Sequence, residues 1–144
     1  MSTFKAVSLS FKNTPLNVRE LFSFSEDGCK ILLHTLREKF DINEALILST
    51  CNRTEVYYSS PIDLNEQIID FLVDNTELGT HGDLKNYFKR INSNLHAIKY
   101  LFEVSVGLHS QVLGDLQISG QAKDAYQWSA DHLRRPTPAA AGAA

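Results

Sequence analysis

The stretch ALILSTCNRTEVYYSS, residues 45–60, decides how this chain folds. Residues 45–48 form a short apolar run, which is typical of a buried strand. Residues 55–58 carry β-branched and aromatic side chains and are followed by Ser-Ser-Pro at 59–61, so a second strand is predicted to end there. The residues between the two runs, 49–54, are polar and include a cysteine. The stretch therefore predicts two neighbouring strands joined by a polar segment.

The chain before and after this stretch supplies further elements. Partial alternation in residues 6–11 predicts a first strand. Ser25 is a favourable helix cap, two acidic residues follow it, and apolar residues then recur at helical spacing, so residues 26–40 are predicted to form an amphipathic helix. Asp63 with Glu66 three residues later resembles a capping box and predicts the start of a second helix.

The second half of the chain is predicted to hold one more strand and two helices. Residues 84–91 are ambiguous, because Tyr87 and Phe88 suit a strand whereas the apolar residues Leu84, Tyr87, Phe88 and Ile91 fit helical spacing, and a strand is favoured. A longer helix is predicted from near Ser93, and a last helix is predicted over residues 117–130. The positions that mark the longer helix at helical spacing are Leu95, Ile98, Leu101, Phe102, Ser105 and Leu108. This order predicts an α+β fold: a ferredoxin-like split βαβ antiparallel sheet with helices on one face, plus C-terminal helices.

Length and composition are those of one ordinary domain. The chain has 144 residues, of which 43% are hydrophobic and 22% charged, and its formal net charge is −3. Residues 1–132 are assigned to the domain, and residues 133–144, where two prolines precede small residues, to a linker or an artificial tail. A cytoplasmic protein without membrane contact is expected, because neither a signal pattern nor a long apolar run is seen.

The segment around Cys51 is the first candidate for chemistry. A lone cysteine is more often a small buried hydrophobe than a nucleophile. A nucleophile is nevertheless favoured here, because Cys51 follows the end of a strand and Arg53 lies two residues on. Arg53 could lower the pKa of the thiol or hold a substrate carboxylate through two hydrogen bonds. Thr50 and Asn52 add short hydrogen-bonding groups.

Residues 107–121 are the second candidate, because glycines and glutamines interrupt an apolar stretch there. One interpretation is a helix–loop–helix with glycines at the helix ends, and the other is a polar loop that closes over a small polar ligand. The segment has no GxGxxG pattern and is not predicted to bind a dinucleotide. A structural role is favoured for its single histidine, His109. No histidine or cysteine spacing indicates a metal site.

Three motifs in this order resemble those of the glutamyl-tRNA reductase family. They are LILSTCNRTEVY at 46–57, the stretch from Leu101 to Tyr126 that contains GLHSQVLGDLQISGQ, and KNTPLNVRE at 12–20. The resemblance runs from about residue 6 to residue 126. It implies NADPH-dependent reduction of glutamyl-tRNA to glutamate-1-semialdehyde, the reaction that opens tetrapyrrole synthesis. It also implies that Cys51 attacks the ester and keeps the glutamyl group as a thioester.

The resemblance also assigns the remaining site residues. Thr50, Asn52 and Arg53 would bind the glutamyl group, with Arg53 facing its side-chain carboxylate. The rest of the substrate pocket would be formed by Ser110, Asp115, Leu116, Gln117 and Gln121.

Several positions depart from the family's pattern. Tyr100 stands where the family has a histidine that assists the chemistry, and with its ordinary pKa of about 10 a tyrosine suits the role of base poorly near neutral pH. Asp115 replaces a glutamate, His109 an acidic residue and Phe11 a histidine. These positions put proton transfer and the details of the pocket in question.

Family members continue with an NADPH-binding domain and a dimerisation domain, neither of which is found in these 144 residues. The isolated chain is therefore expected to be monomeric and unable to reduce a substrate. Glutamyl-tRNA is the implied partner, together with the aminomutase that acts next. Two alternatives stay open: a non-catalytic relic domain that binds glutamyl-tRNA or a partner, and an unrelated cysteine hydrolase, which would need a base near Cys51.

Overall fold

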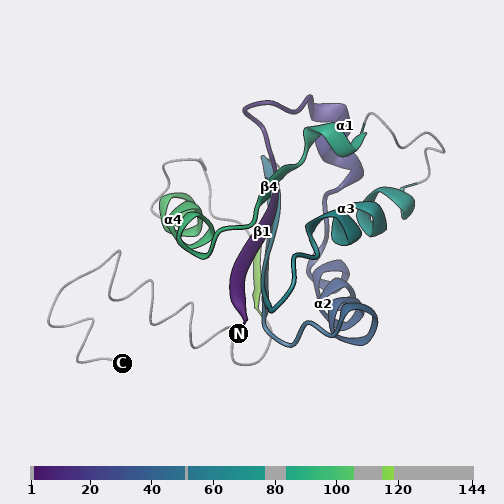
Figure 1. The fold of residues 1–144 in the computed structure, drawn as a ribbon. Coiled ribbons are helices and arrows are strands. Elements are labelled where there is room, and N and C mark those ends of the chain that lie inside the picture. Colours follow the sequence, from purple (N-terminus) through teal and green to yellow (C-terminus); the bar gives the residue numbers. More distant parts are fainter. Residues whose placement is uncertain (1, 51, 77–83, 106–114, 119–144) are drawn as a thin grey trace, which may run out of the picture.

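The computed structural model describes residues 2–50, 52–76, 84–105 and 115–118 (Figure 1). In chain order the elements are β1 Thr3–Ser10, α1 Leu16–Leu21, α2 Glu26–Phe40, β2 Ala45–Ser49, β3 Arg53–Ser60, α3 Asn65–Asp74, the short 3₁₀ helix η1 Leu84–Tyr87, β4 Lys89–Ile91, α4 Asn94–Ser105 and β5 Asp115–Ile118. No helix in these ranges is long and apolar enough to cross a membrane.

The strands form one sheet in the order β4-β1-β3-β2-β5, and every neighbouring pair is antiparallel. Strand β3 lies between β1 and β2, with Val56 opposite both Val7 and Ile47. The α+β class predicted from the sequence is confirmed. Both strands of the 45–60 stretch form, and β3 is longer than expected, so that Arg53 belongs to the strand and not to the polar segment before it.

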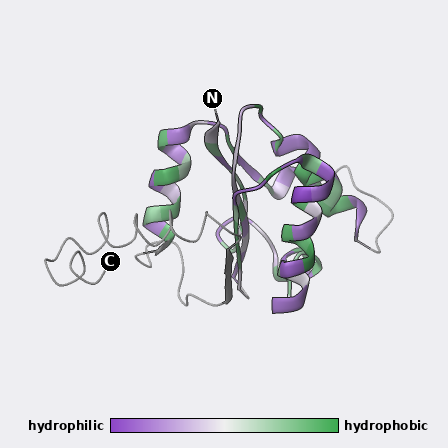
Figure 2. Cartoon of the chain, turned by 90° about the horizontal axis from the view of Figure 1, so that it is seen from below, coloured by the Kyte–Doolittle hydropathy of each residue, from purple (hydrophilic) through white to green (hydrophobic). Residues whose placement is uncertain are grey.

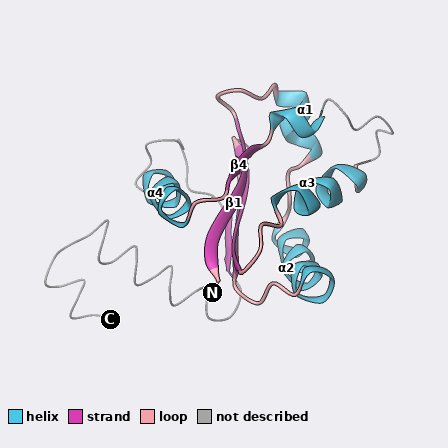
Figure 3. Ribbon diagram, in the orientation of Figure 1, coloured by secondary structure: helices cyan, strands magenta, loops and turns pink. Residues whose placement is uncertain are grey.

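Helices cover both faces of the sheet. Figures 1 and 3 show α1, α2 and α3 on one side and α4 alone on the other. Alternate residues of β3 point to opposite faces, so Val56 and Tyr58 join the core under α2 and α3 while Tyr57 joins the core under α4. Hydrophilic and hydrophobic residues both occur on each helix (Figure 2), as expected of helices with one buried side.

The prediction of α2 is confirmed at both ends. The Ser25 hydroxyl accepts a hydrogen bond from the Gly28 amide at 3.1 Å and caps the first turn. The helix ends at Asp41, whose φ of 56° is left-handed. The Asp41 and Ile42 amides then donate to the Arg37 and Leu36 carbonyls, each at 3.1 Å, and so satisfy the last turn.

The predicted capping box at the start of α3 is wrong. The Asp63 carboxylate accepts from the Asn65 amide at 2.9 Å, but Glu66 does not complete the box. Glu66 instead binds Arg90 of β4, with 3.2 Å between Arg90 Nη2 and Glu66 Oε1. Arg90, which is distant in sequence, thus binds the Glu66 carboxylate that the local pattern predicted to accept a hydrogen bond from the backbone at the helix start.

The ambiguous segment 84–91 contains both structures that its sequence allowed. It begins as η1 and ends as β4, with Leu84, Phe88 and Ile91 buried. Phe88 packs edge-on against Phe22 at 5.0 Å between ring centroids, which ties this segment to the core under the helices.

The predicted face of α4 is confirmed at Leu101 and wrong at Leu95 and Ile98. Leu95 is 71% exposed and Ile98 is exposed as well, whereas Ala97, Leu101 and Val104 are buried against the sheet. Ala97 is small, so it allows the helix to lie close to the strands. A helical pattern of large apolar residues does not include it. The predicted apolar position Leu108 lies outside the described residues.

Strand β5 replaces the start of a predicted helix. Residues 117–130 were expected to be helical, but Gln117 and Ile118 belong to β5 and lie opposite Ile47 and Leu46 of β2. Pairing with the edge of β2 satisfies backbone groups there and outweighs the local helical pattern. The remainder of the predicted helix and residues 133–144 lie outside the described residues.

Candidate functional site

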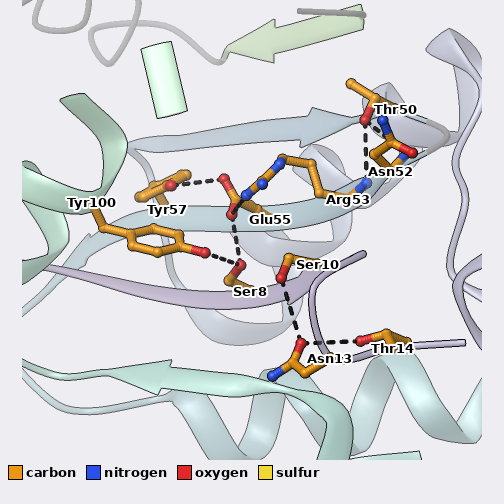
Figure 4. A network of polar contacts seen from close by, with 10 residues as sticks. All are labelled: Ser8, Ser10, Asn13, Thr14, Thr50, Asn52, Arg53, Glu55, Tyr57 and Tyr100. Atoms are coloured by element: carbon orange, nitrogen blue, oxygen red, sulfur yellow. Dashed lines mark hydrogen bonds and ion pairs between the residues drawn. The ribbon is translucent and has the colours of Figure 1, made fainter. Parts of the chain in front are cut away.

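A cluster of polar side chains lies on the α4 side of the sheet (Figure 4). Strand β3 contributes Arg53, Glu55 and Tyr57, which share a face because they alternate along the strand. Ser8 of β1 lies directly opposite Glu55, and Tyr100 reaches the same place from α4. Two strands and one helix thus converge on this polar cluster.

The Glu55 carboxylate is the centre of the cluster and accepts hydrogen bonds from three residues. Its Oε2 atom accepts from Ser8 Oγ at 2.6 Å and from Arg53 Nη1 at 2.8 Å, and its Oε1 atom accepts from Tyr57 Oη at 2.8 Å. The Arg53 and Glu55 side chains are both 0% exposed. Burying a charged pair is costly unless further hydrogen bonds support it, and Ser8 and Tyr57 supply that support.

The Arg53 guanidinium is only partly satisfied. Its Nη1 atom binds Glu55, whereas its Nε and Nη2 atoms are buried and have no hydrogen-bond partner among the described residues. These two nitrogens share one edge of the planar group, the geometry that takes a carboxylate through two parallel hydrogen bonds. The Phe11 ring lies 5.8 Å from the guanidinium carbon. Within the described part of the chain these buried donors are unpaired, and such donors can bind an anionic ligand.

The hydrogen bond between Ser8 and Tyr100 has a defined direction. The Ser8 hydroxyl gives its single proton to the Glu55 carboxylate, which only accepts. Tyr100 Oη, 3.2 Å from Ser8 Oγ, is therefore the donor of the second bond. The Lys89 ammonium also lies 4.7 Å from the centre of the Tyr100 ring. Tyr100 is thus held in place by both its hydroxyl and its ring.

Burial raises the pKa of Tyr57 well above its ordinary value, and the negative charge of Glu55 raises it further. Burial also raises the pKa of Tyr58 and of Tyr100, and Glu55 adds to the shift for Tyr100. Below pH 10 these phenols are protonated in the folded and the unfolded chain alike. Above pH 10 the tyrosines of the unfolded chain lose their protons first. Deprotonation therefore favours the unfolded state, and the free energy of unfolding falls.

We therefore expect the free energy of unfolding to decline above pH 10, by up to about 1.4 kcal/mol per pH unit for each of the buried Tyr57 and Tyr58 and by less for the partly buried Tyr100. Urea unfolding between pH 8 and pH 11.5 measures the slope. Tyr58→Phe should make it shallower, although it also removes the bond from Tyr58 Oη to Asn65 at 2.7 Å and so lowers stability at every pH. An unchanged slope in this variant would contradict the assignment.

The turn between β2 and β3 is closed by Thr50. Its amide donates to the Arg53 carbonyl at 2.8 Å, and its hydroxyl accepts from the amides of Asn52 and Arg53 at 3.1 and 3.2 Å. Cys51 lies outside the described residues. Its two covalent neighbours, Thr50 and Asn52, therefore belong to a tightly hydrogen-bonded turn at one end of the buried cluster.

The other predicted site residues fall into two groups. Asp115, Leu116 and Gln117 lie on β5, where the backbone register places them opposite Ser49, Leu48 and Ile47 of β2. Ser110, His109 and Gln121 lie outside the described residues. The structure thus brings Arg53 and Tyr100 into one cluster and places Thr50 and Asn52 in the adjoining turn.

Sequence reasoning missed Ser8, Glu55 and Tyr57. The signal was the alternation of an arginine, a glutamate and a tyrosine at positions 53, 55 and 57. It was missed because Arg53 was assigned to a loop, which hid its place on the same strand face as Glu55. No group of histidine, cysteine and acidic residues within the described ranges could hold a metal ion.

These features define an α+β domain whose antiparallel sheet carries a buried charged cluster next to a short polar turn. Residues 7–135 match the family model described as glutamyl-tRNAGlu reductase, N-terminal domain. The chain belongs to this family, and the resemblance seen in its sequence motifs is confirmed.

Individual relatives agree with the family model. The chain is 45% identical over 131 residues to the glutamyl-tRNA reductase of Cytophaga hutchinsonii, a match that covers 91% of this chain and 31% of that protein. It is 40% identical over 131 residues to the glutamyl-tRNA reductase of Alkalilimnicola ehrlichii, covering 91% and 29%. The chain therefore spans less than a third of the length of these relatives.

A solved structure shares the fold. The glutamyl-tRNA reductase from Methanopyrus kandleri superimposes with a TM-score of 0.59 at 23% sequence identity, over 94% of this chain and 29% of that one.

Proposed function

We propose that this domain carries the acyl-transfer half of a glutamyl-tRNA reductase, with Cys51 as the nucleophile. The observation that carries the proposal is Arg53, a buried arginine two residues from Cys51 with two N–H donors unpaired among the described residues. A small anionic group such as the side chain of a glutamyl ester fits those donors. The family's motif around Cys51 supports the same role for the thiol.

The proposed step is nucleophilic substitution at the ester. The Cys51 thiolate forms a bond to the glutamyl carbonyl carbon, and the bond from that carbon to the ribose oxygen of the tRNA breaks. The tRNA leaves as an alcohol after its oxygen takes up a proton, and the glutamyl group stays on the protein as a thioester. The reaction needs no oxidant or reductant.

We propose that the Nε–Nη2 edge of Arg53 binds the side-chain carboxylate of the glutamyl group. Glu55 balances the arginine charge through Nη1 and leaves that edge without a partner among the described residues. The Arg53 side chain has no exposed surface in this structure, so a ligand reaches it only after a covering group moves. The family resemblance assigns further contacts to Thr50 and Asn52, and the rest of the pocket to Ser110, Asp115, Leu116, Gln117 and Gln121.

Tyr100 is proposed to orient the reacting groups and not to act as a base. Its pKa lies above the ordinary tyrosine value because of burial and the nearby Glu55 charge, so it is a neutral phenol near pH 7. A neutral phenol can hydrogen-bond a substrate oxygen but cannot take a proton from the Cys51 thiol. Another group must then deprotonate the thiol, or the thiol must ionise to solvent.

The complete proposed activity is that of a cytoplasmic oxidoreductase of tetrapyrrole biosynthesis. Reduction of the thioester to glutamate-1-semialdehyde requires NADPH, for which we propose a binding site in the part of the full-length relatives that this chain does not span. Dimerisation, and contact with the aminomutase that consumes the product, are proposed for the full-length protein as well. The isolated chain is proposed to be monomeric.

A non-catalytic domain that binds glutamyl-tRNA is the second candidate. The observation that favours it is Tyr100, which stands where the family resemblance leads one to expect a histidine. Its hydroxyl is engaged in a hydrogen bond with Ser8. A binding domain would need the Arg53 edge but would not need a reactive thiol at Cys51. Thiol reactivity therefore separates the two functions.

The test is the rate of alkylation of Cys51 by iodoacetamide between pH 5 and pH 10, read by mass spectrometry of the peptide. A nucleophile should show an apparent pKa clearly below about 8.5, the value of a free thiol. Cys29 is 0% exposed and serves as an internal reference that reacts only if the domain opens. An apparent pKa at or above the free-thiol value would favour the binding domain.

A further inference from the structure

We propose that Arg19 is a positioning residue for acyl transfer, acting through Asn52 on the turn that carries Cys51. This inference rests on the proposed function, because it concerns the reactivity of the same thiol. It adds a residue from α1, a segment far from the turn in sequence. The contact between Arg19 and Asn52 carries it.

Arg19 joins three segments of the chain. Its Nε atom donates to the Thr14 carbonyl at 3.1 Å, and its Nη1 atom donates to Asn52 Oδ1 at 3.3 Å. Thr14 is buried in the connection between β1 and α1, so that end of the bridge is fixed. The planar guanidinium thereby ties the Asn52 side chain to a rigid part of the fold.

The turn needs this external contact to fix its side chains. Thr50 already closes the backbone through its amide and its hydroxyl. Those bonds hold the Asn52 backbone amide but do not involve the Asn52 side chain. Arg19 supplies the bond to that side chain, and a side chain held from outside the turn restricts the residues on either side of it.

Arg19 also brings a positive charge to the neighbour of Cys51. The charge of Arg53 is compensated by Glu55 in the buried pair at 2.8 Å, so it is poorly suited to stabilise a thiolate. Arg19 comes from α1 and bonds at the turn to the neutral amide oxygen of Asn52. A cation next to a cysteine favours the thiolate form and lowers the pKa of the thiol.

The geometric and electrostatic parts of this role separate in two variants. Arg19→Lys keeps the charge but carries all its donors on one nitrogen, so it does not reproduce the fixed spacing of the Nε and Nη1 atoms that bond to Thr14 and Asn52. Arg19→Ala removes both. We expect Arg19→Ala to lower the rate of Cys51 alkylation at pH 7 about fivefold, with a rise in the apparent pKa of the thiol. Arg19→Lys should keep most of the lowering of the Cys51 thiol pKa and still slow glutamyl transfer.

Two further variants complete the experiment. Arg37→Ala removes an exposed arginine near the C-terminal end of α2 and should leave the Cys51 profile unchanged. Asn52→Ala should slow glutamyl transfer about as much as Arg19→Lys does, and the Arg19→Lys/Asn52→Ala double variant should be no slower than either, because both changes remove the same contact and keep the positive charge at position 19. If Arg19→Ala opens the domain, alkylation of Cys29 will reveal it. The role of the Arg19–Asn52 contact is then decided by the transfer rates of Arg19→Lys and Asn52→Ala.

The proposal is overturned if Arg19→Ala in a folded domain gives the wild-type alkylation profile, or if the Arg19→Lys and Asn52→Ala effects simply add. Failure of the proposed function looks different. It appears as a wild-type chain that never accepts the glutamyl group, whatever the effect of Arg19 on the thiol. Comparing alkylation of wild type and variant still decides the role of Arg19 in that case.

Discussion

Glu55→Ala should lower the free energy of unfolding by about 3–5 kcal/mol, because it leaves the buried Arg53 charge without its carboxylate. The Ser8 and Tyr57 hydroxyls lose their acceptor in the same variant. Such a loss is a large fraction of the stability of a typical domain, about 5–15 kcal/mol. Urea unfolding at pH 7, followed by circular dichroism, measures it.

Glu66→Ala is the matched control. Glu66 also pairs with an arginine, Arg90, but its side chain is 60% exposed, so the pair gains little in water. Its removal should cost less than about 1 kcal/mol. Similar losses in the Glu55 and Glu66 variants would show that burial does not make the Arg53–Glu55 pair critical.

Arg53→Lys should slow glutamyl transfer to Cys51 by about 100-fold while the domain stays folded. Lysine retains the positive charge beside Glu55, so the buried pair is kept in altered form. It lacks the flat edge with two parallel donors that is proposed to bind the substrate carboxylate. Single-turnover transfer from glutamyl-tRNA, followed by the loss of aminoacylated tRNA, gives the rate.

A second substrate sharpens this experiment. Wild type should strongly prefer glutamyl-tRNA to the same tRNA charged with glutamine, which lacks the carboxylate, and Arg53→Lys should lose most of that preference. Arg90→Lys, at the surface pair with Glu66, should change neither rate nor preference. A wild-type preference in Arg53→Lys would refute the assignment of the carboxylate to Arg53.

Local patterns sufficed for much of the fold. The spans of α2 and β2 and the α+β class follow from apolar spacing and from the Ser25 cap, which act within a few residues. Errors arose where distant partners decide the structure. Glu66 is drawn to Arg90, Gln117 pairs with β2, and the buried side of α4 is set by Ala97 against the sheet, and none of these contacts is encoded in neighbouring residues.

The candidate site divides in the same way. The motif around Cys51 pointed to Thr50, Asn52 and Arg53, because these are adjacent in sequence. The bond of Ser8 to Glu55 and that of Arg19 to Asn52 join residues 47 and 33 positions apart. Such contacts depend on the sheet register and on the packing of α1, so they became visible only in the folded chain.

The acyl-transfer proposal is tested most directly by the mass of the protein after mixing with glutamyl-tRNA. Acid quenching preserves a thioester, and fragmentation locates it. We predict a glutamyl adduct on Cys51 in the wild-type chain and none in Cys51→Ser, which should bind the tRNA equally well. Tight binding of glutamyl-tRNA without any adduct on Cys51 would contradict the account and identify the domain as a binding module.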